Sequence, residues 1–274
     1  MTYLDPFAGR SSVDLQELLE FAHQWDLYDA SIDGQQRMPK WYRGVRYENW
    51  WGSGATLQQV HLLAKNHGIA VAWVPPAGVI RDLVRADESH EAKLAVLVAA
   101  KDEIRAACRQ RYAPDIGEAW PYDYRLSASY VLDAWDDGHI LAAACLALAA
   151  AEDLMYEVSR VDRSKKYKGL KQRAGRDLLE WWPDHEQVAL APIEPLFSTY
   201  FPERDDPIPE NLSRHAALHR LPLEHLSDGH CIVAIMLMIS LLRELERRLV
   251  QEQIDAWSEE QEYLEEDGEH ESVD

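Results

Sequence analysis

Cysteine is scarce in this chain, which has only three cysteines among 274 residues. Cys108, Cys145 and Cys231 lie far apart, and none of them forms the C-x-x-C spacing of a thiolate metal site or a redox motif. An odd number of widely spaced cysteines does not suit a disulfide framework, so we expect a reducing, cytoplasmic compartment. Thirteen glycines and thirteen prolines are too few for a fibrous or largely disordered protein.

Long apolar runs are also missing. The two longest, 140–151 and 231–242, are shorter than the roughly 20 residues that a membrane-spanning helix needs. The start of the chain has neither the basic region nor the apolar region of a secretory signal peptide. We therefore expect a soluble protein that does not associate with membranes, and we read both apolar runs as buried helices.

Acidic residues outnumber basic ones, and the formal net charge is −20. Much of this excess follows Glu252, after which there is no lysine or arginine, so we expect 251–274 to be a solvated, disordered tail. The rest of the chain is still acidic, which argues against broad, non-specific binding to duplex nucleic acid.

One basic segment interrupts this acidic background, at Arg160–Arg176. Such a run is usually a solvated loop or helix face, but here it is also the best candidate for contacts with a phosphate backbone. The predicted RNA-contacting residues in this segment are Lys165, Lys166, Lys168, Lys171 and Arg173.

Most of the chain shows helical periodicity. The expected helices are 56–66, 90–112, 124–137, 139–159 and about 229–250, and glycines close two of them, 56–66 and 124–137. Only Ile69–Pro76, with the sequence IAVAWVPP, resembles a strand, and it could equally be an extended connection. Long helices joined by short connections predict a mainly α fold, an antiparallel helical bundle with at most one short strand.

The expected organisation has three parts. Residues 1–75 form a helical, tryptophan-rich extension, 76–250 form the helical bundle, and 251–274 form the acidic tail. We find no internal repeat.

The most concentrated chemical feature is NLSRHAALHR, residues 211–220. His215 and His219 stand four positions apart, so a helix would place them on one face, as it would two metal ligands. A zinc-protease helix has a glutamate directly after its first histidine, where this chain has Ala216. A metal site would have to draw further ligands from His225, His230, Glu224 or Asp228, and we expect none.

The order of Arg214, His215, three further residues and His219 resembles the catalytic motif of HEPN-domain ribonucleases, a group that includes bacterial toxins and abortive-infection proteins. The full pattern occurs once in the chain. Upstream, RLSASYVLDAWDDGHILAAACLALAAAEDLMYEVS resembles a helix pair of related bacterial proteins, in which the second helix ends in an acidic pair, here Glu152-Asp153. The likeness covers about 90–250. Ser213 and Arg220 replace the asparagine and glycine that often flank the motif in that family. The turns at the two ends of the motif can therefore differ in geometry from those of the family.

The resemblance implies a HEPN-like bundle and a metal-independent endoribonuclease without a cofactor, in which the 2′-hydroxyl of RNA is the nucleophile. An imidazole can move a proton near neutral pH, and this is the role that we assign to His219. Arg214 would stabilise negative charge on the phosphate, and His215 would orient its neighbours. We count Arg220 among the RNA-contacting residues.

Cleavage requires both a base and an acid, but the chain has one motif. The resemblance therefore further implies a homodimer in which two motifs share one cleft. The expected setting is phage defence or a toxin–antitoxin system, with an antitoxin or a sensor protein as a partner. The competing hypothesis is a catalytically silent helical module that binds protein or nucleotide. In that case Arg214 and His219 would pair with nearby acids such as Glu210 and Glu224.

Overall fold

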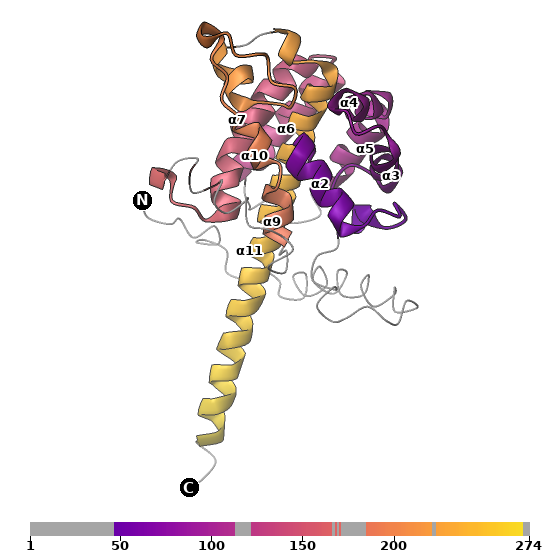
Figure 1. Cartoon of the computed structure of the whole chain (residues 1–274). Coiled ribbons are helices and arrows are strands. Elements are labelled where there is room, and N and C mark those ends of the chain that lie inside the picture. The colour runs from indigo at the N-terminus through magenta and orange to yellow at the C-terminus, as the bar shows by residue number, and fades with distance from the viewer. Residues whose placement is uncertain are drawn as a thin grey trace. The chain divides into compact units, whose positions relative to one another are not determined.

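The computed structural model describes residues 47–112, 122–165, 168, 170, 185–220 and 223–270. The chain divides into two compact units, Met1–Arg43 with Leu245–Asp274 and Gly44–Glu244. The described residues are mainly helical and contain no strand, which confirms the predicted mainly α class (Figure 1). Arg214, His215 and His219 all lie in the second unit.

The first half of the described chain holds short helices, and these are η2 (Glu48–Trp50), α2 (Leu57–His67), α3 (Ala77–Arg85), α4 (His90–Ala99) and α5 (Lys101–Tyr112). The second half holds the longer helices and several single turns. These are α6 (Tyr122–Asp136), α7 (Ile140–Ser159), η3 (Arg163–Lys165), α9 (His185–Leu190), α10 (Ile193–Leu196), η4 (Pro202–Arg204), η5 (Ala216–Arg220), η6 (Leu223–His225) and α11 (Asp228–His270).

Local signals determine the ends of α2. The Thr56 hydroxyl accepts a hydrogen bond from the Gln59 backbone N–H, and the Gln59 side chain accepts one from the Thr56 N–H, a complete capping box. Gly68 ends the helix with φ 67°, a conformation that glycine adopts without steric cost. The helix expected over 56–66 is thereby confirmed.

The helix expected over 90–112 is in fact two helices. Ser89 caps α4, as its sequence position suggests, but the chain leaves helical geometry at Ala100 and begins again as α5. No glycine or proline marks this break. The first turn of α5 carries Asp102 and Glu103, whose negative charges stabilise a helix N-terminus and so favour a new start there.

Ile69–Pro76 forms no strand, so the strand hypothesis was wrong and the segment is a buried connection. Three of its backbone carbonyls accept hydrogen bonds from side chains instead of from a neighbouring strand. Asn49, Trp50 and Ser240 donate these hydrogen bonds, over 2.5 to 2.9 Å. Trp73, with φ 65°, turns the chain in a way that a strand would not allow. The β-branched and aromatic residues of the run are used for packing.

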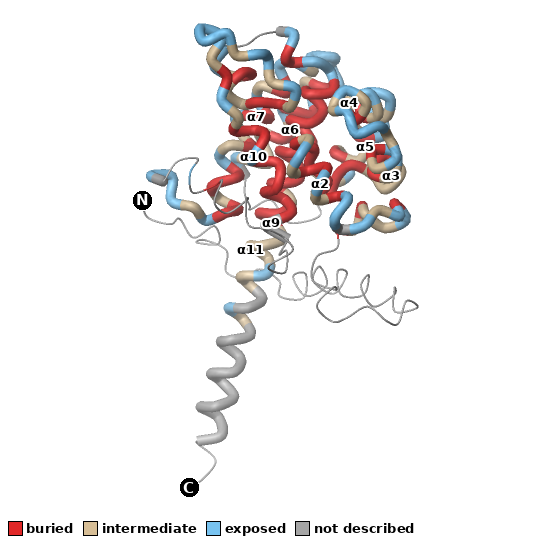
Figure 2. Tube along the Cα trace, in the orientation of Figure 1, coloured by how far each residue is buried: buried red, intermediate tan, exposed pale blue. Residues whose placement is uncertain are grey.

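The core of the second unit is built on α7 and on the first part of α11. α6 and α7 pack closely as a helical hairpin, and small alanines such as Ala143, Ala147 and Ala151 on the buried side of α7 permit this approach. Every residue from Cys231 to Leu242 is buried, as expected for a helix that is apolar on all sides. Figure 2 shows buried stretches in the interior of this unit, along α7 and around α10.

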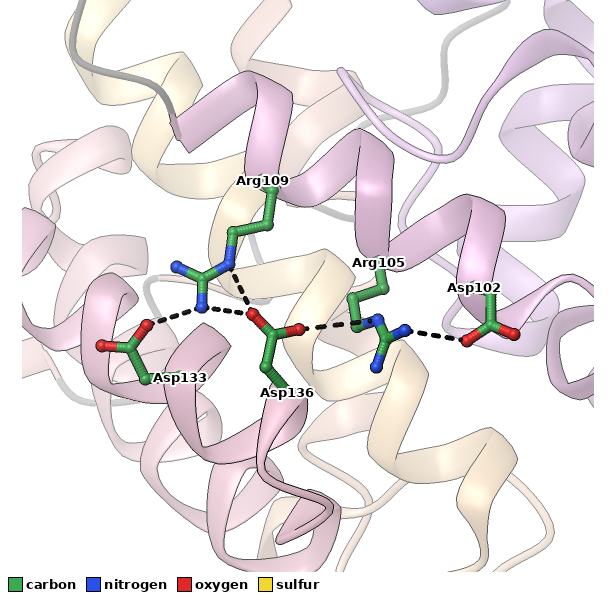
Figure 3. Close-up of polar contacts among 5 residues, drawn as sticks. All are labelled: Asp102, Arg105, Arg109, Asp133 and Asp136. Atoms are coloured by element: carbon green, nitrogen blue, oxygen red, sulfur yellow. Dashed lines mark hydrogen bonds and ion pairs between the residues drawn. The ribbon is translucent and has the colours of Figure 1, made fainter.

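Ion pairs join α5 to α6 on the surface of this unit (Figure 3). Arg109 contacts Asp133 at 2.6 Å and Asp136 at 2.6 Å, and Arg105 bridges Asp136 and Asp102. The hydrogen bond from Arg109 holds the pKa of Asp133 below its usual range. Because these side chains are between a third and three quarters exposed to water, the pairs orient the two helices more than they stabilise the fold.

α11 continues to His270, well into the segment where we expected a disordered tail. Glutamate and glutamine make up half of residues 251–270, and both favour helix. Among the described helices, none combines the length and the apolar character needed to cross a bilayer. Cys108 and Cys231 are buried, and burial raises the pKa of both thiols to about 12, so they behave as apolar side chains.

Candidate active site

The motif lies on a short helix that begins at Ser213. The Ser213 hydroxyl accepts a hydrogen bond from the Ala216 N–H at 3.3 Å and donates one to the Ser198 carbonyl at 2.8 Å. This serine therefore caps the helix and ties it to the segment after α10. Ser213 supplies the turn directly before Arg214.

The helix widens into a π-helical turn over Ala216–Arg220. Residues five apart on a regular α-helix point in directions roughly 140° apart. A π-turn bonds residue i to residue i+5 and so brings such residues onto one side. Arg214 Nη1 accordingly lies 3.0 Å from His219 Nε2, and the two principal residues of the motif are in direct contact.

Glu152 of α7 holds the other side of the Arg214 guanidinium. Its Oε2 atom lies 2.6 Å from Arg214 Nε and 2.5 Å from Nη2, so two nitrogens converge on one carboxylate oxygen. The arginine side chain is only 14 % exposed and the glutamate 23 %. The acid that pairs with Arg214 thus comes from α7, whereas the silent-module hypothesis placed Glu210 or Glu224 there.

The hydrogen bonds define which imidazole nitrogens carry protons in the neutral rings. A guanidinium can only donate, so His219 Nε2 accepts and its proton resides on Nδ1. His215 Nδ1 accepts the Tyr200 backbone N–H at 3.1 Å, which places its proton on Nε2. The ring of His215 also packs against Phe201 and His219, with centroids 5.1 and 5.5 Å away. His215 therefore links the motif helix to the segment after α10.

Ala216 and Ala217, the middle of the motif, are fully buried, whereas His219 and Arg220 are exposed. The helix therefore packs through its small residues and presents His219 to solvent. An exposed imidazole bonded to a guanidinium can exchange protons with a bound ligand while the arginine offers positive charge nearby.

Tyr156 adds a phenol to this region. It lies one turn beyond Glu152 on α7, and the Arg163 guanidinium sits 5.3 Å from its ring centroid. Burial and the negative charge of Glu152 raise the pKa of Tyr156, while Arg163 and Arg214 oppose that shift. The phenol therefore keeps its proton at neutral pH.

The structure places only part of the predicted RNA-contacting set. Lys168 is exposed, Lys165 ends the turn η3, and Arg220 forms an ion pair with Glu203 at 2.8 Å. Arg163, in the same basic segment, pairs with Asp153 and Glu157. The remaining predicted contacts lie outside the described residues, and they are Lys166, Lys171 and Arg173.

The residues considered as metal ligands do not converge. Across the described parts of the chain, no group of three or more histidines, cysteines or carboxylates is placed to hold a metal ion. His225 and His230 are neighbours, with ring centroids 4.9 Å apart, but their nitrogens contact backbone groups of Ser213, Pro209 and Glu210. The structure therefore gives these two imidazoles partners within the fold.

Sequence reasoning missed the pairing of Glu152 with Arg214. The signal was present, because Glu152 interrupts the apolar side of α7 next to the buried Leu148 and Ala151. A carboxylate at the edge of a buried stripe requires a cationic partner. The sequence alone does not identify that partner, which lies 62 positions away.

The comparisons with known proteins add no relative to this picture. No family model matches the chain, and no curated protein and no solved structure shows significant similarity to it.

Proposed function

We propose that this protein is a metal-independent endoribonuclease of the HEPN type. The observation that carries the proposal is the contact between Arg214 Nη1 and His219 Nε2 at 3.0 Å, on a helix whose cap and π-turn bring these residues together. An arginine and a solvent-exposed histidine in contact provide what a phosphodiester reaction needs, a charge stabiliser beside a proton carrier.

In the proposed reaction the 2′-oxygen of RNA attacks the adjacent phosphorus while the bond from phosphorus to the 5′-oxygen breaks. The proton of the 2′-hydroxyl passes to an imidazole base, and a proton from an acid is delivered to the departing 5′-oxygen. The products are a 2′,3′-cyclic phosphate and a 5′-hydroxyl end. Arg214 stabilises the charge that develops on the non-bridging phosphate oxygens.

One motif supplies one exposed imidazole, His219, because His215 accepts the Tyr200 N–H and packs against Phe201. The second proton carrier would come from a second copy of the chain. A two-fold symmetric homodimer would bring both Arg214–His219 pairs to one cleft. Lys168 would contact the RNA backbone there, and Arg220 would do so after it exchanges Glu203 for a phosphate.

Two features fit a setting in phage defence or a toxin–antitoxin system within a reducing cytoplasm. The three cysteines are free thiols. The Arg214 guanidinium is held by Glu152, so an RNA phosphate must compete with a carboxylate for it. Such competition keeps resting activity low, which suits an enzyme controlled by an antitoxin or a sensor protein.

The proposal is tested by cleavage of a labelled, structured RNA in EDTA. We compare the wild-type protein with Arg214→Ala, His219→Ala and the control His139→Ala, which changes an exposed histidine outside the motif. The expected loss of rate is roughly a hundred- to ten-thousand-fold in the first two variants and none in the third. Cleavage that requires added metal, or that survives both motif substitutions, would contradict the proposal.

The Arg214–Glu152 pair itself favours a second candidate function, the silent helical module. A motif arginine neutralised by a carboxylate of its own fold can serve stability alone. In that case no RNA is cleaved by any folded variant, and Glu152→Gln does not create activity.

A further inference from the structure

His225 holds the start of the motif helix through the backbone N–H of Ser213, whereas Ser198 holds it through the Ser213 hydroxyl. Its side chain is 1 % exposed, and its Nε2 atom accepts the Ser213 backbone N–H at 3.0 Å. Its other ring nitrogen, Nδ1, lies 3.1 Å from the Pro209 carbonyl oxygen. A carbonyl oxygen can only accept a hydrogen bond, so Nδ1 carries the proton. Nε2 is unprotonated, and its lone pair accepts the Ser213 N–H.

This arrangement requires a neutral ring. Protonation of Nε2 would direct an N–H group at the Ser213 N–H, so the bond that anchors the helix cap would be lost and replaced by a repulsive contact. Ser213 is fully buried, and its amide would then have no acceptor. The residue displaced first would be Arg214, which directly follows the cap.

We propose that His225 is a positioning residue for the Arg214–His219 pair, and that it fulfils this role only as the neutral imidazole. The part of the proposal that concerns catalysis rests on the proposed ribonuclease function, whereas the anchoring of Ser213 does not.

The surroundings of His225 keep its ring uncharged at neutral pH. His230 of α11 faces it, and His90 of α4 lies beyond, with its Nε2 atom 3.1 Å from His230 Nε2. Burial, followed by the like charge that His230 would carry, lowers the pKa of His225 to about 4. Burial also lowers the pKa of His90 to about 4 and that of His230.

The anchoring can be measured without an activity assay, through hydrogen exchange of the Ser213 amide in the full-length protein at neutral pH. His225→Leu removes the acceptor. His225→Gln places a carboxamide oxygen near the position of Nε2 and does not titrate. We expect about tenfold faster exchange in the leucine variant, matching the loss of one hydrogen bond, and a rate within about twofold of wild type in the glutamine variant.

Two outcomes would overturn the anchoring role. One is an exchange rate of the Ser213 amide in the leucine variant that equals the wild-type rate. The other is equally fast exchange in both variants. If the leucine variant does not fold, acid titration decides the matter. The Ser213 amide signal of the wild type should then shift with a midpoint near pH 4, as the pKa of His225 requires, and that of His225→Gln should not. The same shift in both proteins would refute the proposal.

RNA cleavage separates positioning from a purely structural role. We expect His225→Leu to lower kcat about tenfold with little change in KM. His225→Gln should restore kcat and remove the fall in rate centred near pH 4, and the limb that belongs to the base His219 should remain. Normal exchange at Ser213 in an inactive wild-type protein would contradict the ribonuclease proposal and leave the anchor intact. Unchanged kcat in the leucine variant would contradict the positioning role.

Discussion

Arg214 joins the two other side chains of the candidate site, because its guanidinium contacts both the Glu152 carboxylate and the His219 imidazole. The Glu152 contact is largely shielded from water, so it is stronger than a surface ion pair, and its loss would leave a partly buried positive charge without its partner. Glu152 binds Nε and Nη2 and so determines where the guanidinium points. The remaining nitrogen, Nη1, donates to His219 Nε2.

Replacement of Glu152 by alanine should lower the free energy of unfolding by about 2 kcal/mol. The loss is smaller than for a fully buried ion pair because both side chains keep some exposure to water. The measurement is urea unfolding at neutral pH. Asp153→Ala is the matched control, since Asp153 is the next residue on α7 and its pair with Arg163 is about half exposed. We expect a cost below about 1 kcal/mol there. Equal losses in the two variants would refute the special role of Glu152.

At the scale of elements, the start of α11 determines how closely α4 can approach. A Cβ atom at Gly229 would lie 2.9 Å from Leu94 Cβ, closer than real side chains pack. The glycine therefore permits a contact between two helices whose histidines, His90 and His230, meet at the same place.

Gly229→Ala should destabilise the protein by about 1–3 kcal/mol, although alanine is the better helix former, because overpacking outweighs propensity. Thermal or urea unfolding measures the change. Gly78→Ala in α3 serves as the control, since a Cβ there meets nothing closer than 3.6 Å, and it should be neutral or slightly stabilising. The double variant Gly229→Ala, Leu94→Ala should cost less than the sum of the single changes. Strict additivity would argue against the contact.

At the scale of the whole second unit, four histidines form one continuous series. His67 of α2 stacks on His90 of α4, His90 on His230 of α11, and His230 contacts His225 of η6. All four have a lowered pKa, and burial is the main cause in each. Elements far apart in the sequence thus meet through neutral imidazoles.

Acid should therefore weaken this fold before its carboxylates are protonated. A histidine whose folded pKa lies below its unfolded value is less protonated when folded, so stability is complete above the unfolded value and falls as pH decreases. Between about pH 6.5 and pH 5 we expect a loss of about 1 kcal/mol for each of His90 and His225, after allowance for solvent screening. Urea unfolding across this range provides the test, with His225→Gln showing the shallower slope. A flat wild-type profile would contradict the assignment.

Sequence patterns predicted the helices well where the signals are local. Thr56, Gln59 and Gly68 bound α2, and Gly138 separates α6 from α7, because caps and glycine turns act within a few residues. For Ile69–Pro76 the sequence left a strand and an extended connection open, and the structure shows the connection, whose partners include Ser240, far along the chain. The π-turn that joins Arg214 to His219 has no sequence signature, and the series of histidines exists only in the folded protein.

The most direct test of the central claim is cleavage in EDTA of one labelled RNA prepared in two forms, unmodified and with 2′-O-methyl groups throughout. We predict that the wild-type protein cuts the unmodified RNA to 2′,3′-cyclic phosphate and 5′-hydroxyl ends and leaves the methylated RNA intact. His219→Ala should abolish the cleavage. Cleavage of the methylated RNA, or 5′-phosphate ends that appear only with added metal, would contradict it.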